Sequence, residues 1–194
     1  SYVFERQSSS DFTGRGAYNV ESDESVSTNL TTNYIENVTF SGRTGALELN
    51  SNGSCSRPTL RTDGVSNDGP YCSIFGPDVY TQAFYAEQGQ SISFDWAASD
   101  SSDAFEMYAY LVSVTNLTDI PAASISNHTI ATHAQGGITK WRTDGASIPA
   151  DGYYRLRVVN GTYDETGGLA IGGRTFLNEV VSTGLANEIT FGPF

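Results

Sequence analysis

The sequence predicts an all-β fold, an antiparallel β-sandwich of the jelly-roll type, and three observations lead to that prediction. No segment of the 194 residues repeats apolar side chains with a helical period over three turns. Several segments instead alternate apolar and polar residues, as half-buried strands do. Gly, Pro, Asn and Asp punctuate the gaps between them. Roughly ten short strands without helices are typical of a sandwich or jelly roll.

The expected strands can be placed along the chain. The clearest alternation is found in Ser91–Ala97, Ala104–Val114 and Tyr153–Val159. Shorter segments of the same character are Ser1–Arg6, Glu36–Phe40, Ala46–Leu49, Val79–Tyr85, Thr129–His133, Arg174–Val181 and Glu188–Phe191. The stretch Ile148–Val158, IPADGYYRLRV, predicts a corner whose tyrosine fills the core and hydrogen-bonds across the turn.

The length favours a single domain, residues 1–194, because sandwiches often run to about 200–250 residues undivided. Both ends have strand patterns, in residues 1–6 and 182–194. Each terminal strand either pairs within its own sheet or completes the sheet of a neighbouring subunit by strand addition. Both alternatives remain open at this point.

The charge is strongly one-sided. Twenty-two acids stand against ten bases, which gives a net charge of −12. Such a surface repels phosphate backbones, so we expect no nucleic-acid partner, and it attracts cations such as calcium. No apolar run reaches the about 18 residues that a membrane helix needs, so we expect no membrane insertion.

Cys55 and Cys72 are the only cysteines, and we predict a disulfide between them across a polar loop. No CxxC motif or histidine cluster accompanies them, as a zinc site would require. A disulfide here would contribute about 3 kcal/mol and would indicate a secreted or cell-surface location. Two free buried thiols are the alternative.

Six Asn-x-Ser/Thr sequons are more than chance predicts, and they stand at Asn29, Asn37, Asn52, Asn116, Asn127 and Asn160. In a eukaryotic or archaeal host several of them would carry glycans. In a bacterial host they would carry none.

Signals for catalysis are weak. His128 and His133 are the only histidines, and no Gly-x-Ser-x-Gly, HExxH, P-loop or Gly-x-Gly-x-x-Gly motif occurs. We therefore expect that the protein is not an enzyme. Outward-facing aromatic residues would instead mark a sugar or partner site by stacking, and the candidates are Tyr108, Tyr110 and Trp141.

The densest group of oxygen ligands is Asp95, Asp100, Asp103 and Glu106. Calcium takes six to eight oxygens, and Asp100 and Asp103 are candidates for a ligand loop. The D-x-[DN]-x-[DN]-G spacing of a specific calcium motif is absent. The alternative is that these carboxylates are simply solvated.

Several short motifs resemble one family. They are Phe4-Glu5, Asp11-Phe12-Thr13-Gly14, Phe75-Gly76-Pro77, Ser91–Trp96, Asp103–Tyr108, Ile148-Pro149, Gly152–Arg155, Asn160–Gly168 and Phe176–Val180. With them the chain resembles a jelly-roll module of large bacterial surface adhesins of the repeat-in-toxin type, with a carbohydrate-module-like fold. The resemblance implies a structural calcium ion between Glu5 and Asn178 or Glu179. Asn178 stands where related domains have Asp, which removes one charge from that site.

These observations predict a non-catalytic extracellular module for adhesion or structural assembly. Its expected partner is a surface glycan or protein ligand, or identical subunits in a fibre. The alternatives are a subunit of an extracellular filament joined by terminal-strand exchange, and a carbohydrate-binding module.

Overall fold

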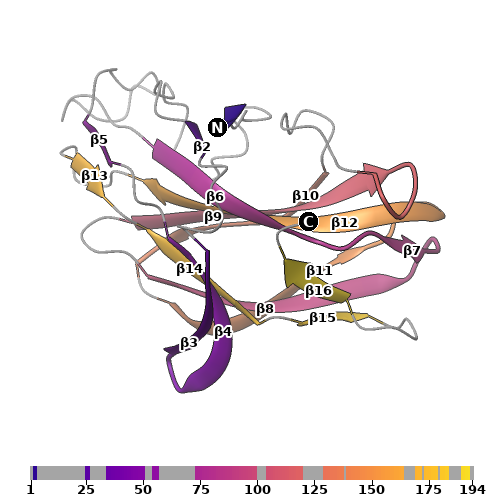
Figure 1. Ribbon diagram of the computed structural model, residues 1–194, viewed down its shortest axis with the longest axis horizontal. Coiled ribbons are helices and arrows are strands. Elements are labelled where there is room, and N and C mark those ends of the chain that lie inside the picture. Colours follow the sequence, from indigo (N-terminus) through magenta and orange to yellow (C-terminus); the bar gives the residue numbers. More distant parts are fainter. Residues whose placement is uncertain are drawn as a thin grey trace.

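The computed structural model confirms the predicted fold class (Figure 1). It describes residues 2–3, 25–26, 34–50, 54–56, 73–99, 104–119, 129–137, 139–163, 169–171, 173–178, 180–183 and 189–192. Within these ranges every regular element is a strand and every strand pairing is antiparallel. The same ranges contain no helix that is long and apolar enough to span a bilayer.

The first sheet has the strand order β3-β4-β14-β8-β11. Its strands are β3 (Tyr34–Phe40), β4 (Arg43–Asn50), β14 (Arg174–Asn178), β15 (Val180–Thr183), β8 (Ser91–Ser99) and β11 (Thr139–Ser147). β15 continues the line of β14 along the same edge of β8. At the opposite edge β11 comes so close to β8 that a Cβ on Gly145 would lie 2.4 Å from the Ile92 carbonyl oxygen.

The second sheet has the strand order β10-β9-β12-β6-β16. Its strands are β10 (Thr129–Gly136), β9 (Ala104–Val114), β12 (Gly152–Tyr163), β6 (Ser73–Thr81), β7 (Phe84–Ala86) and β16 (Ile189–Gly192). The predicted strand Val79–Tyr85 is divided between β6 and β7, which pair with different parts of the same edge of β12.

The strand order is that of a jelly roll. Along the chain, β4, β8, β11 and β14 belong to the first sheet, whereas β6, β9, β10 and β12 belong to the second. The resulting orders β4-β14-β8-β11 and β6-β12-β9-β10 are those of two interlocked Greek keys. β15 and β16 pair with each other and join the two sheets along one side of the sandwich.

The core lies between the sheets, which form the two layers seen in Figure 1. Its largest members include Leu47, Phe94, Trp96, Phe105, Met107, Tyr154, Leu156 and Phe191. β8, β9 and β12 supply most of them, from the faces that their alternation predicts. The Tyr154 hydroxyl donates a hydrogen bond to the Ala150 carbonyl oxygen at 2.6 Å, which confirms the predicted tyrosine corner.

The β3–β4 hairpin reaches over the outer face of the first sheet because each of its strands carries an extra residue. Its turn is Ser41-Gly42, with φ values of 48° and 82°, as a type I′ turn requires. The register slips beside Asn37 on β3 and beside Gly45 on β4, which have φ values of 57° and 69°. Such bulges bend strands and increase their twist. The tip of the hairpin therefore contacts side chains of β8 and β11.

Four short strands form pairs outside the two sheets. β1 (Tyr2–Val3) pairs with β2 (Ser25–Val26), and β5 (Ser54–Ser56) pairs with β13 (Leu169–Ile171). Figure 1 places β2 beside β6. Both predicted terminal strands pair within their own chain here, β1 with β2 and β16 with β15 and β6. Strand exchange between subunits stays a prediction.

Candidate ligand-binding surfaces

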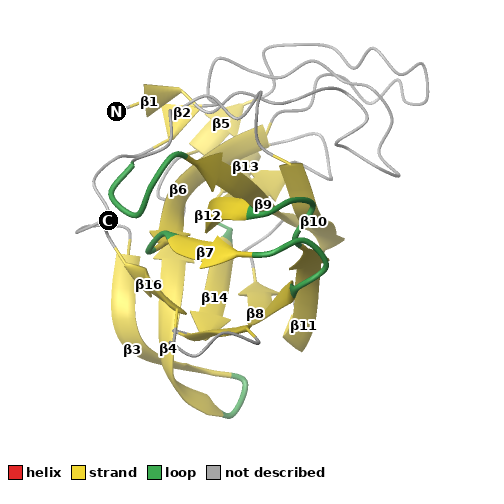
Figure 2. Cartoon of the chain, turned by 90° about the vertical axis from the view of Figure 1, so that its right-hand side faces the viewer, coloured by secondary structure: helices red, strands yellow, loops and turns green. Residues whose placement is uncertain are grey.

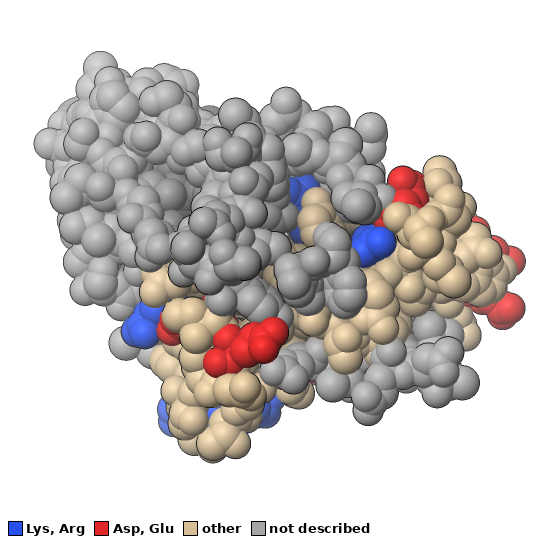
Figure 3. Space-filling view, in the orientation of Figure 1, with Lys and Arg blue, Asp and Glu red and all other residues tan. Residues whose placement is uncertain are grey.

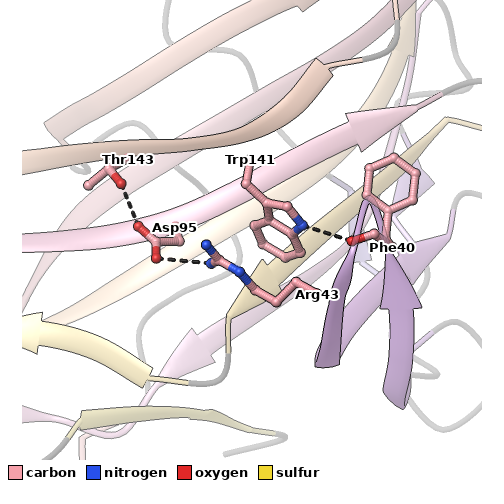
Figure 4. A network of polar contacts seen from close by, with 5 residues as sticks. All are labelled: Phe40, Arg43, Asp95, Trp141 and Thr143. Carbon is pink, nitrogen blue, oxygen red and sulfur yellow. Dashed lines mark hydrogen bonds and ion pairs between the residues drawn. The ribbon is translucent and has the colours of Figure 1, made fainter.

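Trp141 is half-buried on the outer face of the first sheet, beside the tip of the β3–β4 hairpin (Figure 4). Its indole Nε1 donates a hydrogen bond to the Phe40 carbonyl oxygen at 2.8 Å. The guanidinium carbon of Arg43 lies 4.3 Å from the centroid of the indole ring. A cation at this distance is attracted by the ring face. The ring is thus held at its edge and at one face, by residues that come from the hairpin.

Asp95, on β8, fixes the other side of this group. Its Oδ2 accepts a hydrogen bond from Arg43 Nη1 at 3.0 Å, and its Oδ1 accepts one from Thr143 Oγ1 at 2.5 Å. The ion pair is partly exposed, with 39% of the Arg43 side chain and 30% of the Asp95 side chain accessible. An exposed pair contributes only about 0–1 kcal/mol, so its main effect is to position the groups. We call Phe40, Arg43, Asp95, Trp141 and Thr143 the hairpin site.

Further aromatic and cationic side chains continue from the hairpin site across the sheet. The Phe40 ring stacks on Phe176 with centroids 3.9 Å apart and planes 5° from parallel. Arg174 lies over the Phe176 ring at 5.5 Å, donates to Ser99 Oγ at 3.0 Å and pairs with Glu48 at 3.4 Å. The outer face of the first sheet therefore carries aromatic rings interleaved with guanidinium groups. Phe176 is only 2% exposed, so Phe40 and Trp141 are the rings of this group that stay partly accessible.

The prediction that Tyr108 and Tyr110 are available for ligand stacking is wrong. They face away from the core, on the outer side of the second sheet, but they are only 1% and 0% exposed. Their ring centroids lie 5.7 Å apart, and Tyr108 also stacks on His133 at 4.3 Å. Arg157, the cross-strand partner of Tyr110, is 0% exposed as well. Rings that are covered on this side cannot receive a ligand.

The predicted calcium and disulfide sites fall mostly on residues outside those described, namely Glu5, Cys72, Asp100, Asp103 and Glu179. Asn178 is half-buried at the end of β14, opposite Ala46, and Cys55 lies in β5. Over the described ranges no three His, Cys, Asp or Glu side chains gather as metal ligands. The calcium site and the Cys55–Cys72 disulfide stay predictions.

The sequons differ in accessibility. Asn37 and Asn116 are exposed, and Asn116 Oδ1 accepts hydrogen bonds from Thr118 N and Oγ1, both at 2.9 Å. Asn29, Asn52 and Asn127 lie outside the described residues. Asn160 is 0% exposed, so the prediction that it carries a glycan is wrong for the folded chain. Its Nδ2 donates to the Gly173 carbonyl oxygen and its Oδ1 accepts from Thr175 Oγ1, each at 2.8 Å.

Replacing Asn160 with alanine tests this structural role. The variant removes both hydrogen bonds and leaves the Gly173 carbonyl and the Thr175 hydroxyl buried without that partner. We expect the free energy of unfolding to fall by about 2–4 kcal/mol, because each unsatisfied buried group costs about 1–3 kcal/mol. Urea denaturation measures the change, and Asn116→Ala, at an exposed sequon, is the control. Equal stability of the two variants would contradict the buried role of Asn160.

A tyrosine pair that the sequence did not single out lies at one end of the second sheet. β7 places Tyr85 directly opposite Tyr153 of β12, with ring centroids 5.4 Å apart and planes at 67°. Tyr85 is 47% exposed and is flanked by the exposed acids Glu87 and Asp151. We call Tyr85, Glu87, Asp151 and Tyr153 the tyrosine end. Sequence alternation could not reveal it, because the pair is made by two strands distant in the chain.

Comparisons with known proteins place the chain in no family. No protein-family model and no curated protein matches it. One similar solved structure is PliG of Aeromonas hydrophila, a periplasmic inhibitor of g-type lysozyme, at 15% identity over 71% of this chain and 85% of that chain, with a TM-score of 0.25. Another is a CBM4 structure, at 10% identity over 73% and 72% of the chains, with a TM-score of 0.31.

A third similar structure is that of infectious bursal disease virus strain Gx, at 13% identity over 62% of this chain and 32% of the viral chain, with a TM-score of 0.27. TM-scores this low carry no argument about function. The jelly-roll assignment therefore rests on the strand order of the chain itself. None of these three structures is an adhesin of the repeat-in-toxin type, and that resemblance stays an expectation from the sequence.

Proposed function

We propose that this protein is a non-catalytic extracellular module that attaches to a surface ligand, and that the ligand is a glycan bound at the hairpin site. The observation that carries the proposal is the fixed orientation of Trp141, which is held by Phe40 and Arg43. A sugar ring stacks its apolar face on an aromatic side chain while its hydroxyls bond to nearby polar groups. The hairpin site offers the ring, a carboxylate, a guanidinium group and a hydroxyl together.

Preorganisation supports the same proposal. Sites that are mostly formed before the ligand arrives lose less side-chain entropy on binding. At the hairpin site, Asp95 and Arg43 are fixed by each other, and Thr143 is fixed by Asp95. Strands β8 and β11 carry Asp95, Trp141 and Thr143, so most of the site is built on regular structure rather than on loops.

The absence of catalysis is part of this proposal. In the described ranges the histidine that could act as a base, His133, stacks on Tyr108. Both carboxylate oxygens of Asp95 are engaged, by Arg43 and Thr143. These contacts favour a binding role over an acid–base role for the groups concerned.

Glycan binding is tested on a glycan array, with and without calcium, and then by titration calorimetry with the best oligosaccharide. We expect Trp141→Ala to weaken binding at least about tenfold, a loss of about 1.4 kcal/mol, because the stacking surface is removed. Trp141→Phe retains a ring and should bind within about threefold of the wild type. Tyr85→Ala, at the tyrosine end, is the remote control and should not change the affinity.

Two outcomes would overturn the proposal. One is an array without any hit in either condition. The other is a bound glycan whose affinity is the same for the wild type and for Trp141→Ala. A fold check by circular dichroism accompanies each variant, since Trp141 also tethers the hairpin through the Phe40 carbonyl.

The filament subunit remains the second candidate because β16 is a short terminal strand in a structurally important place. It pairs with β15 on one side and with β6 on the other, and so closes one side of the sandwich. Ile189 and Phe191 of this strand belong to the core. A β16 donated by a neighbouring copy would fill the same place by strand addition.

A further inference from the structure

The tyrosine end combines exposed aromatic surface with negative charge. Tyr85 and Tyr153 face each other edge to face across β7 and β12, which lie next to each other in Figure 2. Among the large hydrophobic residues of the described ranges, Tyr85 is one of the few that are exposed, with a relative accessibility of 47%. Glu87 follows it in the turn after β7, and Asp151 precedes β12. In Figure 3, acidic side chains gather at the right-hand end of the molecule, where Figure 1 shows β7.

One acid of the tyrosine end, Asp151, is held in place by the backbone. Gln88 N donates a hydrogen bond to Asp151 Oδ1 at 2.8 Å, which links the turn after β7 to the turn before β12. Two further backbone bonds, Gly89 N to the Ile148 carbonyl at 3.0 Å and Ile148 N to the Gln90 carbonyl at 2.7 Å, strengthen this link. These bonds tie the two turns together and fix the Asp151 carboxylate, and Glu87 lies in the turn after β7.

Within the described ranges, no base forms an ion pair with the acids at this end. The sequence has no Lys or Arg between Arg61 and Lys140, a stretch that includes β6, β7, β8 and β9. The nearest base in sequence to Tyr153 is Arg155, whose guanidinium bonds the backbone carbonyls of Asp119 and Thr81 instead.

The acids of the tyrosine end also affect the pKa of Tyr85. The pKa of its phenol is raised by loss of hydration and by the negative charges of Asp151 and Glu87. A raised pKa keeps the protonated, neutral phenol to higher pH than in free tyrosine. The ring is uncharged at physiological pH, as an ordinary tyrosine also is, and its electron-rich face is available to a cation.

We propose that the tyrosine end is a second binding site, distinct from the hairpin site, which takes a lysine or arginine side chain of a basic partner protein. The cation would lie against the Tyr85 and Tyr153 rings and pair with Glu87 and Asp151. Aromatic faces attract such cations, and nearby carboxylates add charge complementarity. A neutral sugar could also stack here and donate hydrogen bonds to the carboxylates, but a cation gains charge complementarity as well, which favours a cationic ligand.

The test uses a fluorescein-labelled hexalysine peptide, with its fully acetylated form as the uncharged probe, in a series of salt concentrations. We expect the whole chain to bind the charged peptide and not the acetylated one. Tyr85→Ala should weaken binding about threefold to tenfold, because the cation–π contact is lost while the charge is unchanged. Tyr85→Phe keeps the ring and should bind like the wild type.

Two single-charge variants distinguish peptide binding at this site from general attraction of a basic peptide to an acidic protein. Glu87→Gln should weaken binding and flatten its salt dependence, whereas Glu36→Gln, an equal charge change on exposed β3, should have a clearly smaller effect. Equal losses in the two variants, or unchanged binding by Tyr85→Ala, would overturn the proposal. So would a neutral oligosaccharide that binds at Tyr85 when the charged peptide does not.

The hairpin site is tested separately in the same series. Trp141→Ala should leave hexalysine binding unchanged, whereas Tyr85→Ala should leave glycan binding unchanged. A loss of peptide binding in Trp141→Ala would contradict the independence of the two sites. Failure of glycan binding alone would therefore not affect the proposal for the tyrosine end.

Discussion

Replacement of Trp96 by alanine is expected to lower the free energy of unfolding by about 3–5 kcal/mol, the usual cost of truncating a large aromatic side chain in a core. Trp96 is 0% exposed and meets the Phe105 ring edge to face at a centroid distance of 5.7 Å. Because β8 and β9 belong to opposite sheets, this contact joins the two layers. The variant leaves a cavity at that junction, which the surrounding strands can only partly fill.

The polar edge of Trp96 allows a sharper version of the experiment. Its Nε1 donates a hydrogen bond to Asp144 Oδ2 at 2.6 Å, and the guanidinium of Arg142 lies 4.8 Å from the ring. Trp96→Phe keeps most of the core contact and loses this bond, so we expect a cost of about 1–2 kcal/mol. Guanidinium denaturation followed by circular dichroism compares the variants. If both substitutions cost the same, packing at Trp96 is not what joins the sheets.

Combined replacement of Ile189 and Phe191 by alanine is expected to have the largest effect on stability, a loss of at least about 5 kcal/mol. Both side chains point from β16 into the core and are only 2% and 6% exposed. A domain of ordinary stability has about 5–15 kcal/mol in total, so the double variant should be largely unfolded or close to it. Thr190→Ala, on the opposite face of the same strand, is the control.

The Thr190 side chain bonds Gln82 Oε1 at 2.8 Å, so the control variant should lose only about 1 kcal/mol. Thermal melts rank the three proteins. A stable double variant would show that β16 is dispensable for the sandwich. It would also remove the reason for a neighbouring subunit to supply this strand.

The filament alternative is tested by asking whether β16 can be supplied from outside the chain. A synthetic peptide of residues 184–194, added to a chain that ends at residue 183, should restore the folded state if β16 can be supplied from outside. Electron microscopy and size in solution then show whether whole chains exchange the strand. Regular fibres that the Ile189 and Phe191 replacements abolish would support exchange. Compact monomers at every concentration would contradict it.

Strand alternation predicts the side of a sheet but not its exposure, and Tyr108 and Tyr110 illustrate the limit. The sequence correctly predicts that both tyrosines lie on the face of β9 opposite to the one that carries Met107 and Ala109. Their burial depends on what lies over the outer face of the second sheet, which is a tertiary property. Trp141 is the reverse case: the sequence did not predict its strand, β11, because Thr139–Ser147 has few apolar residues to mark an alternation. Its surroundings are set by the β3–β4 hairpin, about 100 residues earlier in the chain.

The sequence by itself determined the all-β class, the main core residues and the tyrosine corner, because each depends on local periodicity and turn chemistry. Only the tertiary structure decided the jelly-roll strand order and the positions of the hairpin site and the tyrosine end. Both sites are made by strands that are far apart in the chain, such as β7 with β12. Pairing of this kind follows from burying two sheet faces together, a condition on the whole chain that no local pattern records.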